Sequence, residues 1–203
     1  METKMNDDMK TNDSALRGCG TDSAKEPPKG QGKKVVVAYS GGLDTSYTVM
    51  YLSQELGYEV HAVCADTGGF SPEQLTDNEA RALTLGAKTY KTLDVTQEYY
   101  AKSLKYMIFG NVLRNGTYPI SVSSERIFQG LAIARYAREI GAHAIAHGST
   151  GAGNDQVRFD MTFKVLAPEM EIITLTRDMQ LSRQQEIDYL NAHGFPADFK
   201  KLK

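Results

Sequence analysis

The sequence is poor in the features that mark secreted, membrane and nucleic-acid-binding proteins. It has only two cysteines, Cys19 in a polar stretch and Cys64 in an apolar run, so we expect no disulfide framework. No aliphatic run is long enough to span a bilayer. Lysine and arginine number 23 against 25 aspartates and glutamates, and the net charge of −2 gives no general attraction to nucleic acid or anionic lipid. These absences predict a cytoplasmic protein with no nucleic-acid or membrane partner.

The first 32 residues contain no aromatic residue, no valine and no isoleucine, and they end in KEPPKGQG. Such a segment buries too little apolar surface to offset the entropy of ordering it. It also lacks the apolar core of a secretory signal. We therefore expect residues 1–32 to form a disordered N-terminal extension. The rest of the chain is long enough for one domain with a sizeable core.

From Lys33 onward, short apolar runs alternate with helical patterns. Strands are predicted at 34–39, 59–65, 88–93, 142–147 and 171–175, and helices at 45–56, 76–86, 96–113, 125–140, 156–166 and from 182 to about 194. Two helix starts carry capping boxes, Thr76 with Glu79 and Ser182 with Gln185. The alternation predicts an α/β fold, a parallel sheet of about five strands with helices on both faces. Ligands of such sheets bind beyond the carboxyl ends of the strands, so we expect the loops after residues 39, 65 and 147 to meet at a site.

The turn after the first strand reads AYSGGLDTS, from Ala38 to Ser46. Its backbone N–H groups and the following helix N-terminus would face an anion, and Gly41 and Gly42 let the backbone approach closely. The sequence lacks the Gly-Lys-Ser/Thr of a Walker A loop, the G-x-G-x-x-G dinucleotide fingerprint and the G-x-S-x-G nucleophile elbow. An ordinary βα turn capped by Asp44 is the plain alternative, and the full pattern S-G-G-x-D-[ST]-S favours the anion site.

A second glycine loop, HGSTGAGNDQVRF, begins at His147 after a predicted strand. Arg158 can hold a carboxylate through two parallel hydrogen bonds, Asp155 can accept from an ammonium, and Asn154 can donate and accept. Together they suit an amino acid, although each alone also fits a helix cap or a solvated face. His143 and His147 have no third ligand at metal spacing, so we expect core or loop-edge histidines and no zinc site.

Ser40 to Ser46 resembles the pyrophosphate loop of the ATP pyrophosphatases, which cut ATP between its α- and β-phosphates and adenylylate an acceptor. With the second loop, the chain from about Lys33 to Pro196 resembles the argininosuccinate synthase family. The resemblance implies a ligase of arginine biosynthesis and the urea cycle that joins citrulline to aspartate through a citrullyl-adenylate, using ATP and Mg²⁺. It implies an adenine nucleotide alpha hydrolase-like, Rossmann-like domain over residues 33–203, without the family's C-terminal synthetase and oligomerisation domain. It further implies a cytoplasmic homotetramer when full length.

The resemblance also assigns roles to individual residues. The ATP site would be lined by Ala38, Tyr39, Ser40, Gly41, Gly42, Leu43, Asp44, Thr45, Ser46, Ala65 and Gly148. Citrulline would contact Tyr118 and Ser123, from the segment NGTYPISVSSER, together with Asn154 and Arg158. Aspartate would contact Thr150, Asn154 and Asp155. The catalytic candidates are Asp44, Asp155 and Arg158, and no protein metal site is expected.

In this chemistry neither step needs an enzyme nucleophile, so positioning and charge stabilisation would supply the acceleration. The residues leave open whether Asp155 or a phosphate oxygen takes the proton from the aspartate ammonium. Two other functions also stay open. A tRNA-thiolating or lysidine-forming ATP pyrophosphatase would carry paired active-site cysteines or a basic RNA-binding face, and the sequence shows neither. A non-catalytic ATP-binding fragment is the other alternative, because family members are considerably longer.

Overall fold

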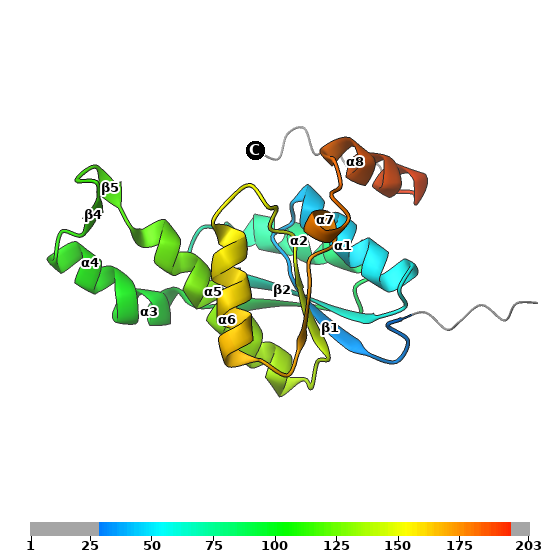
Figure 1. Ribbon diagram of the computed structural model, residues 1–203, viewed down its shortest axis with the longest axis horizontal. Helices are drawn as coiled ribbons and strands as arrows, with labels where there is room; N and C mark the ends of the chain where they lie inside the picture. Colours follow the sequence, from blue (N-terminus) through cyan, green and yellow to red (C-terminus); the bar gives the residue numbers. More distant parts are fainter. Residues whose placement is uncertain (1–28, 196–203) are drawn as a thin grey trace, which may run out of the picture.

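The computed structural model describes residues 29–195, apart from the side chains of Tyr118 and Pro119. Five parallel strands form one sheet in the order β3-β2-β1-β6-β7 (Figure 1). They are β1 (Lys34–Ala38), β2 (Glu59–Asp66), β3 (Thr89–Asp94), β6 (Ala144–His147) and β7 (Glu171–Ile173), and a separate antiparallel pair joins β4 (Leu113–Arg114) to β5 (Tyr118–Pro119). The helices are α1 (Leu43–Gln54), α2 (Pro72–Thr84), α3 (Thr96–Tyr99), the π-helical η1 (Tyr100–Leu104), α4 (Lys105–Phe109), α5 (Ser121–Glu139), α6 (Asp155–Leu166), α7 (Leu175–Asp178) and α8 (Arg183–Ala192). The predicted α/β fold with a five-stranded parallel sheet is confirmed.

Each face of the sheet carries its own apolar core. Val35, Val36 and Val37 of β1 are fully buried, and because successive strand residues point to opposite faces they serve both cores. Val35 and Val37 pack with α1, α2 and α8, for example with Leu190 of α8. Val36 packs with α5 and α6 on the opposite face, where Phe163 is fully buried. The unbroken valine run is thus the expected pattern of a central strand covered on both sides.

The strand order reverses between β1 and β6. Along the chain, β2 is added beside β1 and β3 beside β2, whereas β6 lies on the other side of β1. Ala38 of β1 is in register with His147 of β6. The segments leaving these two strands therefore diverge over neighbouring strand ends. In parallel α/β sheets this is the crevice in which ligands bind.

Several predicted boundaries differ from the structure. The helix predicted from Thr76 begins at Pro72, because the capping box is formed by Ser71 and Gln74 and not by Thr76 and Glu79; the Thr76 hydroxyl instead donates to the carbonyl of Pro72 inside α2. The helix predicted at 96–113 contains the π turn η1 and ends at Phe109. The helix predicted from residue 125 begins one turn earlier, at Ser121. The capping box of Ser182 and Gln185 opens α8 as predicted.

Residues 1–28, most of the expected N-terminal extension, lie outside the described residues. The last residues of that extension, 29–32, form a turn in which the Gly30 N–H donates to the carbonyl of Leu56 at 2.8 Å. Within the described part of the chain, every helix is too short or too polar to cross a membrane.

Candidate functional site

The first glycine turn joins β1 to α1 and has a conformation that only glycine adopts easily. Gly41 has a φ of +77°, in the left-handed region. A Cβ added at Gly41 would also collide with the side-chain amide of Asn78 from α2. Arg81 of the same helix donates from Nη1 to the Gly41 carbonyl at 2.7 Å, which ties the turn to α2. The second glycine of the pair, Gly42, is the N-cap of α1.

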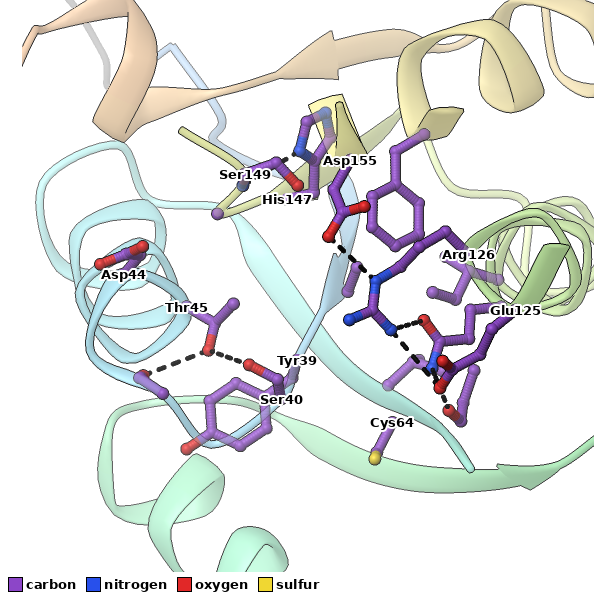
Figure 2. A pocket seen from close by; sticks show the side chains of 18 of the residues that line it. Tyr39, Ser40, Asp44, Thr45, Cys64, Glu125, Arg126, His147, Ser149 and Asp155 are labelled. Atoms are coloured by element: carbon purple, nitrogen blue, oxygen red, sulfur yellow. Dashed lines mark hydrogen bonds and ion pairs between the residues drawn. The ribbon is translucent and has the colours of Figure 1, made fainter. Parts of the chain in front are cut away.

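The hydroxyl groups of this turn are held close together. Ser40 Oγ lies 3.4 Å from Thr45 Oγ1, and Thr45 Oγ1 donates to the Gly42 carbonyl at 3.2 Å (Figure 2). Ser46, by contrast, is fully buried, with its Oγ 3.5 Å from the hydroxyl of Tyr39. The turn therefore exposes Ser40, whereas Thr45 is mostly buried and Ser46 connects α1 to the residue that follows β1.

A cavity of about 650 Å³ lies over the strand ends at the point where the strand order reverses. Its volume is in the range of small-molecule sites. Of the residues predicted to contact ATP, it is lined by Ala38, Tyr39, Ser40, Gly42, Leu43, Asp44, Thr45, Ala65 and Gly148. Gly41 and Ser46 are not among the lining residues, so their contact with ATP stays a prediction. The three segments after β1, β2 and β6 do meet, as the alternation of strands and helices predicts.

The two glycine loops touch. A Cβ added at Gly148 would lie 3.0 Å from Asp44 Cβ and 3.1 Å from Thr45 Cγ2, so only glycine lets the second loop pass this closely over the start of α1. Ser149 and Thr150, the next residues of the loop, line the same cavity. The close approach joins the two motifs into one wall of the cavity.

The first turns of α5 supply cavity residues to which the sequence had assigned no role. Arg126 lies between two acids, donating from Nε to Asp155 Oδ2 at 3.1 Å with Nη1 3.5 Å from Glu125 Oε1 (Figure 2). Glu125 also accepts from the Thr67 hydroxyl at 2.7 Å, and Gln129 donates to the Ala65 carbonyl at 3.4 Å. These contacts join the segment after β2 to the loop after β6 and place a guanidinium in the cavity wall. The i, i+3 and i, i+4 spacing of the polar side chains on α5 was the signal in the sequence.

A second cavity of about 380 Å³ adjoins the first, and the two share Gly153 and Asp155. Its lining is formed by Arg114, Ile120, Val122, Ser123, Gly153, Asn154, Asp155 and Arg158. Arg158 donates from Nη1 to Asp155 Oδ1 at 2.7 Å and from Nη2 to Ser123 Oγ at 3.0 Å. The structure thus brings Ser123, Asn154, Asp155 and Arg158 together, whereas the predicted Thr150 lines the first cavity only. Tyr118 lies on β5, and its side chain is outside the described part of the chain.

Asp155 is held between two guanidinium groups. Burial alone would raise the pKa of its carboxyl, but hydrogen bonds and charge from Arg126 and Arg158 lower that pKa below its usual range. Asp155 is therefore an ionised carboxylate at neutral pH and a weak proton acceptor. It suits the binding of a cation better than general-base work.

His147 is a buried and neutral side chain at the end of β6. It is 1% exposed, its Nδ1 accepts from the Ser149 N–H at 3.3 Å, and its Nε2 lies 2.8 Å from Asp160 Oδ1. Since Nδ1 accepts, Nε2 carries the proton and donates to Asp160. Burial lowers the pKa of His147, against the opposing effect of Asp160. His147 is thus a core histidine that reaches the loop edge, as predicted, while His143 is exposed.

Glu186 of α8 is a buried acid next to the first glycine turn, and no sequence pattern marks it beyond its place in a helix. It is 1% exposed and accepts from the Thr176 hydroxyl at 2.8 Å. Burial, followed by hydrogen bonding and charge from Asp44, raises the pKa of Glu186 to about 7. Glu186 is therefore protonated below about that pH.

The parallel sheet, the glycine turn at the reversal of strand order and the cavity over the strand ends define a Rossmann-like domain of the α/β class, with its cavity at the position where such sheets bind ligands. The family model described as Arginosuccinate synthase N-terminal HUP domain matches residues 34–196. The chain belongs to the argininosuccinate synthase family. It is 40% identical over 163 residues to the argininosuccinate synthase of Pyrobaculum aerophilum, covering 80% of this chain and 41% of that protein. It is 39% identical over 168 residues to the one from Methanocaldococcus jannaschii, covering 83% and 42%, and 40% identical over 166 residues to the one from Bacillus pumilus, covering 82% and 40%. The chain thus spans about two fifths of the length of these relatives.

Proposed function

We propose that this chain is the ATP-binding part of an argininosuccinate synthase, a ligase that joins citrulline to aspartate and splits ATP into AMP and pyrophosphate. The observation that carries the proposal is the 650 Å³ cavity in which the glycine turn after β1 meets the glycine loop after β6. The adenine nucleotide would occupy this cavity, with its phosphates toward Ser40, Thr45 and the N-terminus of α1. The family membership and the names of the relatives support the same reaction.

The amino-acid substrates would lie toward the second cavity. Citrulline would contact Ser123, Asn154 and Arg158, with Tyr118 as a further predicted contact, and aspartate would contact Asn154, Asp155 and Thr150. Arg158 already donates to Ser123 and Asp155, so its planar fork is oriented before a substrate carboxylate arrives.

In the reaction, the ureido oxygen of citrulline attacks the α-phosphorus, and the bond from that phosphorus to the bridging oxygen of the β-phosphate breaks. Pyrophosphate leaves toward the first glycine turn, whose N–H groups and hydroxyls stabilise its charge. The amine of aspartate then attacks the activated carbon and AMP departs. The low pKa of Asp155 makes a phosphate oxygen the better acceptor for the amine proton.

The residues present fit Mg²⁺ as the companion of ATP. The described residues hold no group of three or more His, Cys, Asp or Glu side chains that would bind a metal by themselves. Mg²⁺ is commonly held by one or two carboxylates together with substrate phosphates, and Asp44 offers a carboxylate in the cavity wall. Bound there, the ion would neutralise charge that develops on the departing pyrophosphate.

Titration calorimetry with MgATP tests the nucleotide site. Asp44→Ala removes the carboxylate from the cavity wall and should weaken MgATP binding by about tenfold or more. Asp77→Ala, on the exposed side of α2, is the matched control and should leave the affinity unchanged. Equal affinity in wild type and Asp44→Ala would reject the assignment.

An assay for AMP and pyrophosphate, with citrulline and aspartate present, separates the ligase from a module that only binds ATP. AMP formation that depends on citrulline supports the ligase, whereas MgATP binding with no AMP supports the module. A thiolating enzyme is disfavoured by Cys64, because its burial raises the pKa of the thiol to about 11 and keeps it protonated.

A further inference from the structure

Arg177 of α7 is connected to the second glycine loop indirectly, through two sets of hydrogen bonds. Its Nη1 donates to Gln156 Oε1 at 3.1 Å and to Asp160 Oδ2 at 3.0 Å, and its Nη2 donates to the Thr174 hydroxyl at 3.1 Å. The planar guanidinium satisfies these three acceptors together, with the side chain 28% exposed. A single side chain thus connects α7 to Gln156 and Asp160 of α6.

The first route runs through an amide. Gln156 Nε2 donates to the carbonyl of Gly151 at 2.8 Å and to that of Gly153 at 3.2 Å. Because Arg177 occupies Oε1 of the same amide, the NH₂ end of Gln156 is directed toward the loop. The orientation of this amide is therefore set by the guanidinium.

The second route runs through the acid and the buried histidine. Burial would raise the pKa of Asp160, but hydrogen bonds from His147 and Arg177 lower that pKa below its usual range. The ionised Asp160 accepts a hydrogen bond from the Nε2–H of His147. The other ring nitrogen, Nδ1, is therefore unprotonated and accepts a hydrogen bond from the Ser149 N–H. The start of the loop is held in this way.

Side-chain packing does little to order the loop at Gly151 and Gly153. A Cβ added at Gly151 or Gly153 would find no atom within 4 Å, so no neighbouring side chain presses on the loop there. Glycine backbone without packing has many accessible conformations. The hydrogen bonds directed by Arg177 are therefore the main restraint on this part of the cavity wall.

We propose that Arg177 is a positioning residue that fixes the loop from Gly148 to Gly153 in its ligand-receiving conformation, acting through Gln156 and through the Asp160–His147 pair. The proposal rests on the function proposed above, because Gly148, Ser149 and Thr150 line the cavity assigned to ATP. A loop that is already ordered spares the ligand the entropy of ordering it.

Hydrogen exchange on the 203-residue chain tests whether the loop is fixed. In Arg177→Met, exchange of the Ser149 N–H, followed in fragments covering residues 148–155, should become about tenfold faster, while exchange in β1 and α2 stays unchanged. Gln156→Ala and Gln156→Glu should speed exchange in the same fragments. The glutamate variant keeps a partner for Arg177 but loses the NH₂ group that holds the glycine carbonyls. Arg138→Met, which removes an exposed ion pair with Glu169, is the matched control.

MgATP titration of the same variants tests whether the fixed loop matters for the ligand. Affinity should fall about tenfold in Arg177→Met and in both Gln156 variants, and Arg177→Lys should lie between, because an ammonium cannot hold three acceptors in one plane. Unchanged exchange in the loop, faster exchange throughout the chain, or faster loop exchange with unaltered MgATP affinity would each overturn the proposal. Absence of MgATP binding to the wild-type chain would instead overturn the proposed function, and the exchange data would still decide whether Arg177 fixes the loop.

Discussion

Replacing Glu186 by glutamine should stabilise the protein at alkaline pH. Glu186 is 1% exposed, accepts a hydrogen bond from Thr176 and adjoins Asp44. The glutamine carbonyl can accept from Thr176 in the same way, and the amide NH₂ can donate to the Asp44 carboxylate. The variant therefore keeps the shape and the hydrogen bonds of the protonated acid but never becomes charged.

The magnitude follows from the pKa of the buried acid. In the unfolded chain a glutamate titrates near 4.5, whereas burial and Asp44 raise the pKa of Glu186 in the folded protein to about 7. Between these values the folded state binds more protons than the unfolded state, so stability falls as the pH rises, and the full cost is present above pH 7. The gap corresponds to about 3 kcal/mol of unfolding free energy. Arg183 opposes part of this cost, because its charge lowers the pKa of Glu186.

Urea unfolding of wild type and Glu186→Gln, from pH 4 to pH 8 without nucleotide or metal, measures this difference. The variant should match wild type near pH 4.5 and exceed it by about 3 kcal/mol at pH 8. Glu169→Gln is the matched control, because Glu169 is exposed and paired with Arg138, so its replacement should give no gain at alkaline pH. A stability difference that does not change with pH, or a variant less stable than wild type at pH 8, would refute the reasoning.

Two further predictions concern the cavities. Gly41→Ala should lower the unfolding free energy by at least about 1–2 kcal/mol, because alanine must adopt a φ of +77° and its Cβ collides with Asn78; Gly151→Ala, which meets open space, is the control, and equal urea midpoints would contradict this. Arg158→Lys should weaken citrulline binding by about 1.5–3 kcal/mol, because lysine keeps the charge but loses the fork that reaches both Asp155 and Ser123. An unaltered citrulline dependence of AMP formation would count against that role.

The fold and the first glycine turn could be predicted because their signals are local. The buried valine run, the glycine pair and the following helix lie in one continuous stretch, and each of them limits the backbone directly. The predicted start of α2 was wrong. The capping box is predicted at Thr76 and Glu79, but Ser71 and Gln74 form it, followed by Pro72 at the first helical position, which proline favours.

The rest of the site depends on contacts between segments far apart in the chain. Arg126 acquires its place because α5 crosses beside the loop that carries Asp155, and Glu186 becomes a buried acid only when α8 packs against α1. The π turn in η1 gives no sequence pattern distinct from an ordinary helix. Local propensities do not encode such distances, so these residues emerge only from the packed structure.

The reversal of strand order also dictates when the site can exist during synthesis. The first three strands, β1, β2 and β3, emerge from the ribosome early and can pair with one another. The other edge of β1 stays unpaired until β6 is synthesised much later. Until then the backbone groups of a valine-rich strand are unpaired, and such an edge invites association with other chains. The cavity opens over this late-forming pairing of β1 with β6. A ligand of this cavity can therefore stabilise the nascent chain only after β6 has paired with β1.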